Sequence, residues 1–197
     1  MKIKVIILFL FIFFISSTAM AHPHIFLTNK IQAIFNDTGL SGFKISWLAD
    51  DFSSAGLTDG YDENENELID KAELAIFEND SVNNLKQFQY FTRLKIDGKP
   101  LIVNKVKDFK ASLTDGKIEY SFFVPCPVKA TDISKSIIIA QYDSSYFSFI
   151  SFSEQEPVSI TNGEKFQSEF TIAENKNESY YFDMVHPFEM NLRFKVK

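Results

Sequence analysis

Apolar and polar residues alternate along most of this chain, and this period of two limits its fold more than any other feature of the sequence. Successive side chains of a β-strand point to opposite faces, so the alternation is typical of strands with one buried and one solvated face. One expected core face, near the end of the chain, consists of Phe188, Met190, Leu192, Phe194 and Val196. Two others consist of Ile118, Tyr120, Phe122 and Val124, and of Phe43, Ile45 and Trp47. The sequence therefore predicts a mainly β fold.

Residues that tolerate positive φ lie between several of these alternating runs. They occur at residues 37–39, 97–98, 115–116 and 162–163, each an Asp or Asn followed closely by Gly. Such pairs are common in hairpin turns, which join antiparallel strands. We therefore expect an antiparallel β-sandwich, in which the core faces of two sheets pack together.

One segment, at about residues 50–88, breaks the alternation and has helical spacing instead. Its periodic apolar residues are Leu74, Phe77, Leu85 and Phe88. Asp70 and Glu73 have the spacing of an N-cap residue and its reciprocal partner three positions later. We expect a helix to begin near Asp70, within a helical insertion in the β domain.

The first 21 residues have the order of a secretory signal peptide. Lys2 and Lys4 precede an apolar run over residues 5–15, and small residues lead to Ala21. The run is shorter than the ~20 residues that span a bilayer, and no later stretch is long and apolar enough to cross one. We expect cleavage after Ala21. Residues 22–197 would then form a single β-rich, exported, soluble domain, with no membrane insertion.

The charge balance favours cations as ligands. The chain has 26 Asp and Glu against 20 Lys and Arg, a formal charge of −6 at pH 7. An acidic surface repels nucleic acid and anionic lipid but attracts cations. Metal ions are therefore the expected partners, and nucleic acid is not.

The segment Asp62–Glu73 carries oxygen-bearing residues at the spacing of an EF-hand loop. In such a loop, positions 1, 3, 5, 7, 9 and 12 surround Ca²⁺ with about seven oxygens. The residues at these positions are Asp62, Asn64, Asn66, Leu68 through its carbonyl, Asp70 and Glu73. Position 6, which is normally Gly, is Glu67, and two side-chain ligands are uncharged, so we expect weak affinity, on the order of 10⁻⁴ to 10⁻³ M. The alternative is an acidic loop that only caps a helix, which accounts for Asp70 and Glu73 but not for the ligand-type residues before them.

The three histidines of the chain, His22, His24 and His186, are the candidate transition-metal ligands. Pro23 has no amide proton, which excludes the amino-terminal site that uses two deprotonated backbone amides. Chelation by the amine and ring of His22, completed by a second imidazole, is still available, and imidazole suits Zn²⁺, Ni²⁺ and Cu²⁺. The alternative is a solvated terminus and an ordinary loop histidine at His186.

Motifs of nucleophilic catalysis and phosphate binding are missing from the sequence. No Ser lies in a Gly-flanked elbow, and no Gly-rich phosphate loop is present. Five aromatic residues close together are expected in the sheet core rather than on a sugar-binding surface: Tyr142, Tyr146, Phe147, Phe149 and Phe152. We therefore expect no enzymatic activity.

Several segments taken together resemble one family. They are residues 22–26, 47–52, 70–74, 90–98 and 142–147. In this order they resemble the domain of unknown function 1007 family, described as periplasmic components of uncharacterised ABC-type transport systems. The resemblance implies a periplasmic protein linked with nickel, cobalt or zinc transport. Members often have Gly where this chain has Glu67, and the difference bears on calcium affinity.

Three functions follow from these observations as hypotheses. The first is a periplasmic metal-ion-binding accessory protein, linked to a transition-metal transporter, with a structural Ca²⁺ in the EF-hand-like loop. The second is a copper oxidase or oxygenase in which His22, its amine and a second His form a histidine brace near Tyr180 or Tyr181. The third is a metal-free interaction protein that docks to a membrane transporter.

Overall fold

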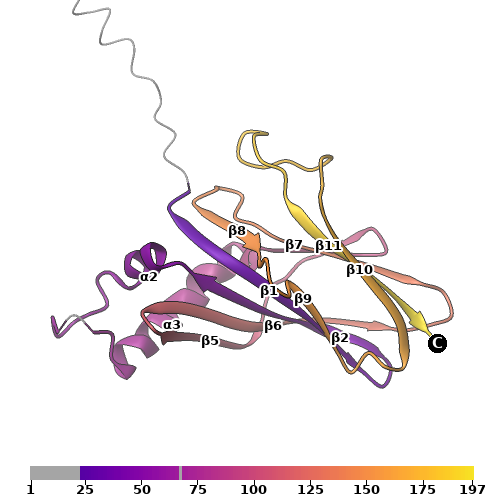
Figure 1. Ribbon diagram of the computed structural model, residues 1–197, viewed down its shortest axis with the longest axis horizontal. Coiled ribbons are helices and arrows are strands. Elements are labelled where there is room, and N and C mark those ends of the chain that lie inside the picture. Colours follow the sequence, from indigo (N-terminus) through magenta and orange to yellow (C-terminus); the bar gives the residue numbers. More distant parts are fainter. Residues whose placement is uncertain (1–22, 67) are drawn as a thin grey trace, which may run out of the picture.

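Strands of two β-sheets make up much of the computed structural model, which describes residues 23–66 and 68–197 (Figure 1). The predicted signal peptide, His22 and Glu67 lie outside these described residues. The first sheet has the strand order β5–β6–β2–β1–β8, and β9 also pairs with β1. Its strands are β1 (Ile25–Asn36), β2 (Gly39–Ala49), β5 (Lys107–Thr114), β6 (Lys117–Lys129), β8 (Ser148–Phe152) and β9 (Val158–Thr161). β1 is antiparallel to β2 but parallel to β8 and β9.

The second sheet is antiparallel throughout, with the order β10–β11–β7–β3–β4. Its strands are β3 (Thr92–Ile96), β4 (Lys99–Leu101), β7 (Lys135–Gln141), β10 (Phe166–Glu174) and β11 (Phe188–Val196). The prediction of a mainly β fold with largely antiparallel pairing is confirmed.

Most residues of the core faces expected from the alternation are buried, and they come from both sheets. Phe188 and Val196, at the two ends of β11, were expected there wrongly: they are 55% and 45% exposed. Trp47 of β2 is fully buried, as are its neighbours on that face. Phe35 of β1 lies 5.1 Å from the ring centroid of Phe166 of β10 in a stacked arrangement. It also meets Phe194 of β11 edge-on at 5.1 Å. Buried residues of the two sheets therefore belong to one hydrophobic cluster.

Three of the four expected hairpin turns are present, and one expectation is wrong. The turns at 37–38, 97–98 and 115–116 join β1 to β2, β3 to β4 and β5 to β6. Residues 162–163 do not form a hairpin, because β9 pairs with β1 in the first sheet and β10 pairs with β11 in the second. The chain passes there from one sheet to the other, and a Cβ on Gly163 would lie 2.6 Å from a methyl carbon of Ile160.

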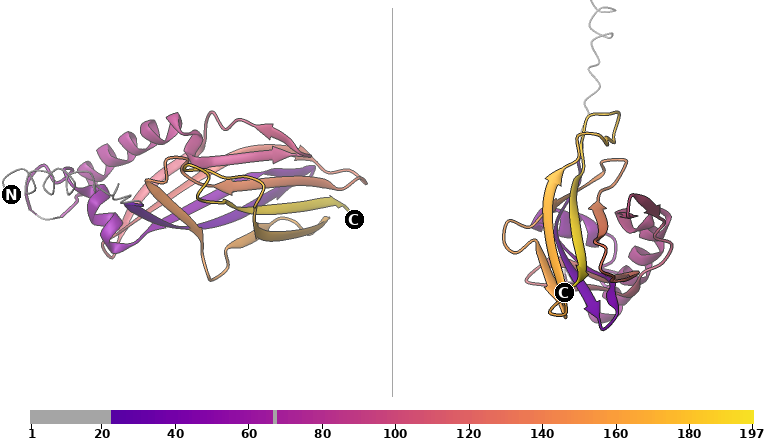
Figure 2. Two further views of the ribbon diagram at one scale, coloured as in Figure 1. Left: turned by 90° about the horizontal axis from the view of Figure 1, so that it is seen from above. Right: turned by 90° about the vertical axis from the view of Figure 1, so that its right-hand side faces the viewer.

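The segment that breaks the alternation forms two α-helices, α2 (Asp51–Thr58) and α3 (Lys71–Gln87), followed by a short 3-10 turn, η1 (Gln89–Phe91). Both α-helices lie at one end of the sheets (Figures 1 and 2). The predicted capping box is present, with Asp70 as N-cap and Glu73 as its partner. Phe77 of α3 is buried and its ring stacks on that of Tyr120 at 5.9 Å. Within the described ranges, no helix has the length and apolar character needed to cross a membrane.

Candidate functional site

Glu73 closes the loop that connects α2 to α3. The residue is only 4% exposed. Its Oε1 accepts hydrogen bonds from the backbone N–H of Glu63 at 2.9 Å and from Nδ2 of Asn64 at 3.1 Å. Its Oε2 accepts from the backbone N–H of Asp70 at 2.8 Å. One buried carboxylate therefore joins the start of the loop to its end.

The other predicted ligand residues shape the loop from within. Asp62 Oδ1 accepts from the backbone N–H of Asn66 at 3.1 Å, and Asn66 Oδ1 accepts from that of Leu68 at 2.9 Å. Glu65 adopts the left-handed region, with φ of 57°. Asp and Asn side chains commonly bond to backbone N–H groups two or more residues further on, which curls the chain. Asp70 caps α3, as expected, while its second expected role as a calcium ligand stays a prediction.

The two described histidines have different surroundings. The backbone N–H of His24 donates to the Phe147 carbonyl at 2.9 Å, where β1 begins, and the two rings lie 4.9 Å apart. Nδ1 of His186 lies 2.8 Å from the carbonyl oxygen of Glu178. A carbonyl oxygen can only accept, so Nδ1 carries the proton and Nε2 presents a lone pair when the ring is neutral. His22, the third predicted ligand, lies outside the described residues.

A metal centre built from several acidic, His or Cys side chains is not preformed in the described part of the chain. Among residues 23–66 and 68–197, no three His, Cys, Asp or Glu side chains form a group that could hold a metal ion. The expected calcium ligands differ from such a group, because they include two Asn side chains and a backbone carbonyl. The assignments of Ca²⁺ to the loop and of a transition metal to the histidines both stay predictions.

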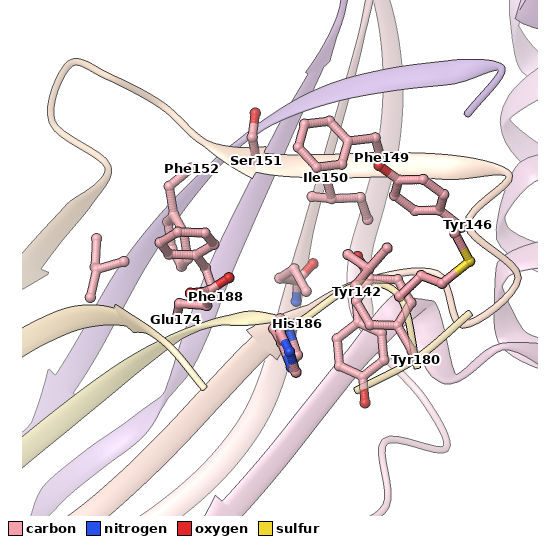
Figure 3. Close-up of a pocket in the computed structure, with 15 residues that line it drawn as sticks. Tyr142, Tyr146, Phe149, Ile150, Ser151, Phe152, Glu174, Tyr180, His186 and Phe188 are labelled. Atoms are coloured by element: carbon pink, nitrogen blue, oxygen red, sulfur yellow. The ribbon is translucent and has the colours of Figure 1, made fainter. Parts of the chain in front are cut away.

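His186 also lines a cavity of about 530 Å³ (Figure 3). The cavity lies between β8 of the first sheet and β7, β10 and β11 of the second, and the loop after β10 completes it. Four of the five aromatic residues expected in the sheet core line it: Tyr142, Tyr146, Phe149 and Phe152. Phe152 also packs against the hydrophobic cluster, whereas Phe147, the fifth, is 48% exposed. Gln141, which no sequence motif singles out, lines it as well.

The fold and these side chains define a class: a mainly β protein of two sheets, with candidate ligand groups in an acidic loop and in an aromatic cavity. The chain belongs to the family described as "Protein of unknown function (DUF1007)", which matches residues 7–187. An uncharacterized 15.5 kDa protein in the trpE 3′ region of Spirochaeta aurantia is 31% identical over 127 residues, covering 64% of this chain and 90% of that protein. An uncharacterized protein of Haemophilus influenzae is 25% identical over 154 residues, covering 75% of this chain and 71% of that protein.

Proposed function

We propose that this chain is an exported, periplasmic metal-ion-binding accessory protein of an ABC-type or related metal transport system, without catalytic activity of its own. In this proposal residues 1–21 are a cleaved signal, and the two sheets form a β-sandwich with an EF-hand-like insertion. The link to transport rests on the family resemblance. The formal charge of −6 supports it, because an acidic surface concentrates cations.

The buried carboxylate of Glu73 is the observation that carries the calcium part of the proposal. It accepts three hydrogen bonds from N–H groups, two from the start of the loop and one from near its end, and so keeps the two ends close together. A carboxylate that already accepts from Glu63, Asn64 and Asp70 stands at loop position 12, which supports the proposal because that position supplies the bidentate ligand of an EF-hand Ca²⁺ shell. A half-turn of the Asn64 side-chain amide would bring its Oδ1, in place of Nδ2, next to Glu73. A bound Ca²⁺ would then take the place of the N–H groups that now donate to the Glu73 carboxylate.

Calcium titration of the purified protein, monitored by calorimetry, tests this proposal. A parallel titration uses Tb³⁺ luminescence sensitised by Tyr61, which directly precedes the loop. We expect saturable binding with Kd on the order of 10⁻⁴ to 10⁻³ M. Glu73→Gln should weaken binding by at least about tenfold, because the charged bidentate ligand is lost. Glu65→Gln is the matched control, since it removes one charge from the same loop at a position that is not a ligand. Equal weakening in both variants, or no saturation up to about 10 mM calcium, would contradict the calcium site.

The transition-metal part of the proposal rests on His22, His24 and His186. It is supported by the protonated Nδ1 of His186, since a hydrogen bond from one ring nitrogen to a carbonyl is the usual way to orient the other toward a metal. Titration with Zn²⁺, Ni²⁺ and Cu²⁺ should give one tight site that weakens in His24→Ala and in His186→Ala. The transition-metal site would be contradicted if none of the three ions bound, or if both variants bound all three ions as tightly as the wild type. Neither result would bear on the calcium site.

A further inference from the structure

Strand β10 forms one edge of the second sheet. It pairs with β11 over nine residues, Phe166–Glu174, in a continuous antiparallel register, and no other described strand pairs with it. Figure 1 shows β10 beside β11 at the margin of that sheet. An edge strand presents a row of backbone N–H and C=O groups that can pair with another chain.

The other sheet edges in the described part of the chain are short or blocked. β4 has three residues and contains Pro100, which has no N–H to donate. β8 and β9 have five and four residues. β5 has a register irregularity between Lys107 and Lys110, and its Ala111 N–H donates to Glu78 Oε2 of α3 at 2.8 Å. Natural proteins blunt their sheet edges in these ways, but β10 has neither a proline nor a register shift.

A hydrogen bond just beyond β10 shows which of its backbone groups point outward. The Asn175 N–H donates to the Pro187 carbonyl at 2.8 Å, and these two residues continue the register of β10 with β11. In an antiparallel pair the opposed residues bond to each other at every second position. The odd-numbered residues of β10 therefore bond to β11. The N–H and C=O groups of Ser168, Phe170 and Ile172 point away from the sheet, toward its open edge.

The inner face of β10 is apolar, but the core covers only its start. Phe166 is 5% exposed and stacks on Phe35. Phe170 points to the same face, because it lies four positions along the strand, yet it is 40% exposed. Its neighbour on β11, Leu192, is fully buried. An apolar side chain thus lies partly in water beside backbone groups that can still pair.

A second copy of β10 fits this edge in one register. Outward groups must meet outward groups, so an antiparallel pair related by a two-fold axis joins even residues to even and odd to odd. The register centred on Phe170 pairs all nine residues and, beyond the strand ends, places Glu164 opposite Lys176 of the second copy. The register centred on Glu169 would instead place two carboxylates directly opposite each other, which destabilises a sheet pair.

We propose that the protein forms a symmetric homodimer through β10, in which the two copies of the second sheet join into one continuous sheet. The N–H of Phe170 in each copy donates to the Phe170 carbonyl of the other, and the two rings pair on the inner face. Glu169 of each copy faces Thr171 of the other. This interface uses neither the calcium loop nor the histidines, so it is independent of the function proposed above.

The size of the edge sets the expected strength of the dimer. A paired edge of nine residues is small beside a standard protein interface of about 1,600 Å². We therefore expect a reversible dimer whose fraction rises with protein concentration.

Sedimentation equilibrium of the purified protein over a range of concentrations tests the proposal. The wild type should approach twice the mass of one chain. Phe170→Lys should weaken the dimer by at least about tenfold, because two like charges replace an aromatic pair directly across the axis. Thr171→Lys is the matched control, since it adds the same charge to the next residue of the strand. There the new Lys faces Glu169 of the second copy, so the dimer should be as strong as in the wild type or stronger.

A mixture of two variants tests the register directly. Phe170→Glu should be as monomeric as Phe170→Lys, again because like charges face each other. An equimolar mixture of the two variants should regain the dimer, because Lys then faces Glu across the interface. This comparison is between variants of one position, so it still decides the question if either substitution lowers the stability of the monomer. Far-UV circular dichroism confirms that each variant is folded.

Three results would overturn the proposal. A wild-type protein that stays monomeric up to about 1 mM would mean that the edge does not pair with itself. Dimers that Phe170→Lys leaves unchanged, or that Thr171→Lys weakens equally, would have a different interface or register. A mixture of Phe170→Lys and Phe170→Glu that stays monomeric would mean that Phe170 does not face itself.

Discussion

Glu178 links the loop after β10 to the second sheet. Its Oε2 accepts from Lys95 Nζ at 2.7 Å, and its Oε1 accepts from the Tyr142 hydroxyl at 2.8 Å. Its backbone carbonyl also receives Nδ1–H of His186. This single residue therefore fixes Tyr142 and His186, which both line the aromatic cavity.

Acid should weaken the protein partly through Glu178. The hydrogen bond from Lys95 lowers the pKa of Glu178 below its usual 4.5. A lowered folded-state pKa adds stability that is complete above the unfolded pKa and is lost as pH falls through the folded pKa. Glu178→Gln should cost roughly 1 kcal/mol at neutral pH, and less at about pH 3, because the contribution of the carboxylate falls once the pH drops below its usual pKa of 4.5.

Urea unfolding of wild type and Glu178→Gln at about pH 6 and about pH 3 measures this difference. Glu169→Gln on β10 is the control, with little change expected at either pH. A cost of Glu178→Gln that stays constant between the two pH values would contradict the role of the ionised carboxylate.

Residue roles could be predicted from the sequence where partners are near in the chain. The helix-capping role of Asp70 and the oxygen spacing of residues 62–73 are local patterns, and the capping box is present. Gln141 could not be found in this way, because its partner Thr92 lies 49 positions away. Its place at the aromatic cavity is set only once β3 and β7 have paired.

Helix α2 is fixed to the first sheet by its own side chains. Asp50 caps its first turn, with Oδ1 accepting from the Ser53 N–H at 2.7 Å. Ser53 Oγ accepts from the backbone N–H of Phe26 at 2.8 Å, and Ser54 Oγ from that of Ile118 at 3.0 Å. Buried serines thus supply acceptors to two strands, which positions the start of the calcium-candidate loop.

Loss of the α2 cap should lower stability without changing the fold. Asp50→Ala should cost about 0.5 to 2 kcal/mol, because the Ser53 N–H loses its acceptor. Asp50→Ser should recover most of the loss, since Ser is also a good N-cap residue. The free energy of unfolding from urea titration measures both. An Asp50→Ser variant as unstable as Asp50→Ala would mean that the negative charge of Asp50, rather than its hydrogen bond to the Ser53 N–H, is important.

The positions of strands and turns could be predicted better than the pairing between strands. Alternation identifies strands, and Gly-containing turns identify three hairpins, because both depend on neighbouring residues. The parallel pairing of β1 with β8 and β9 joins segments more than 100 positions apart. No residue pattern within β1 distinguishes a parallel from an antiparallel neighbour. For the same reason the local pattern at residues 162–163 predicts a hairpin, although these residues connect the two sheets.

At the scale of the whole molecule, the two sheets share one hydrophobic core. Phe35 contacts Phe166 and Phe194 of the opposite sheet, and buried side chains of both sheets form a single cluster. Neither sheet can expose its inner face without exposing that of the other. Removal of a side chain at this junction should therefore destabilise both sheets together.

Phe35→Ala tests this coupling. Deleting a fully buried ring should cost about 3 to 5 kcal/mol through lost burial and a residual cavity. Phe52→Ala is the matched control, because Phe52 is 77% exposed and its loss should change stability by no more than about 0.5 kcal/mol. Urea unfolding is followed by Trp47 fluorescence, which reports the first sheet, and by far-UV circular dichroism, which reports both. Coincident transitions that shift together in Phe35→Ala are expected, because the ring is packed by both sheets. A circular dichroism transition that remains at the wild-type midpoint, while the fluorescence transition moves, would mean that the second sheet is stable without the first.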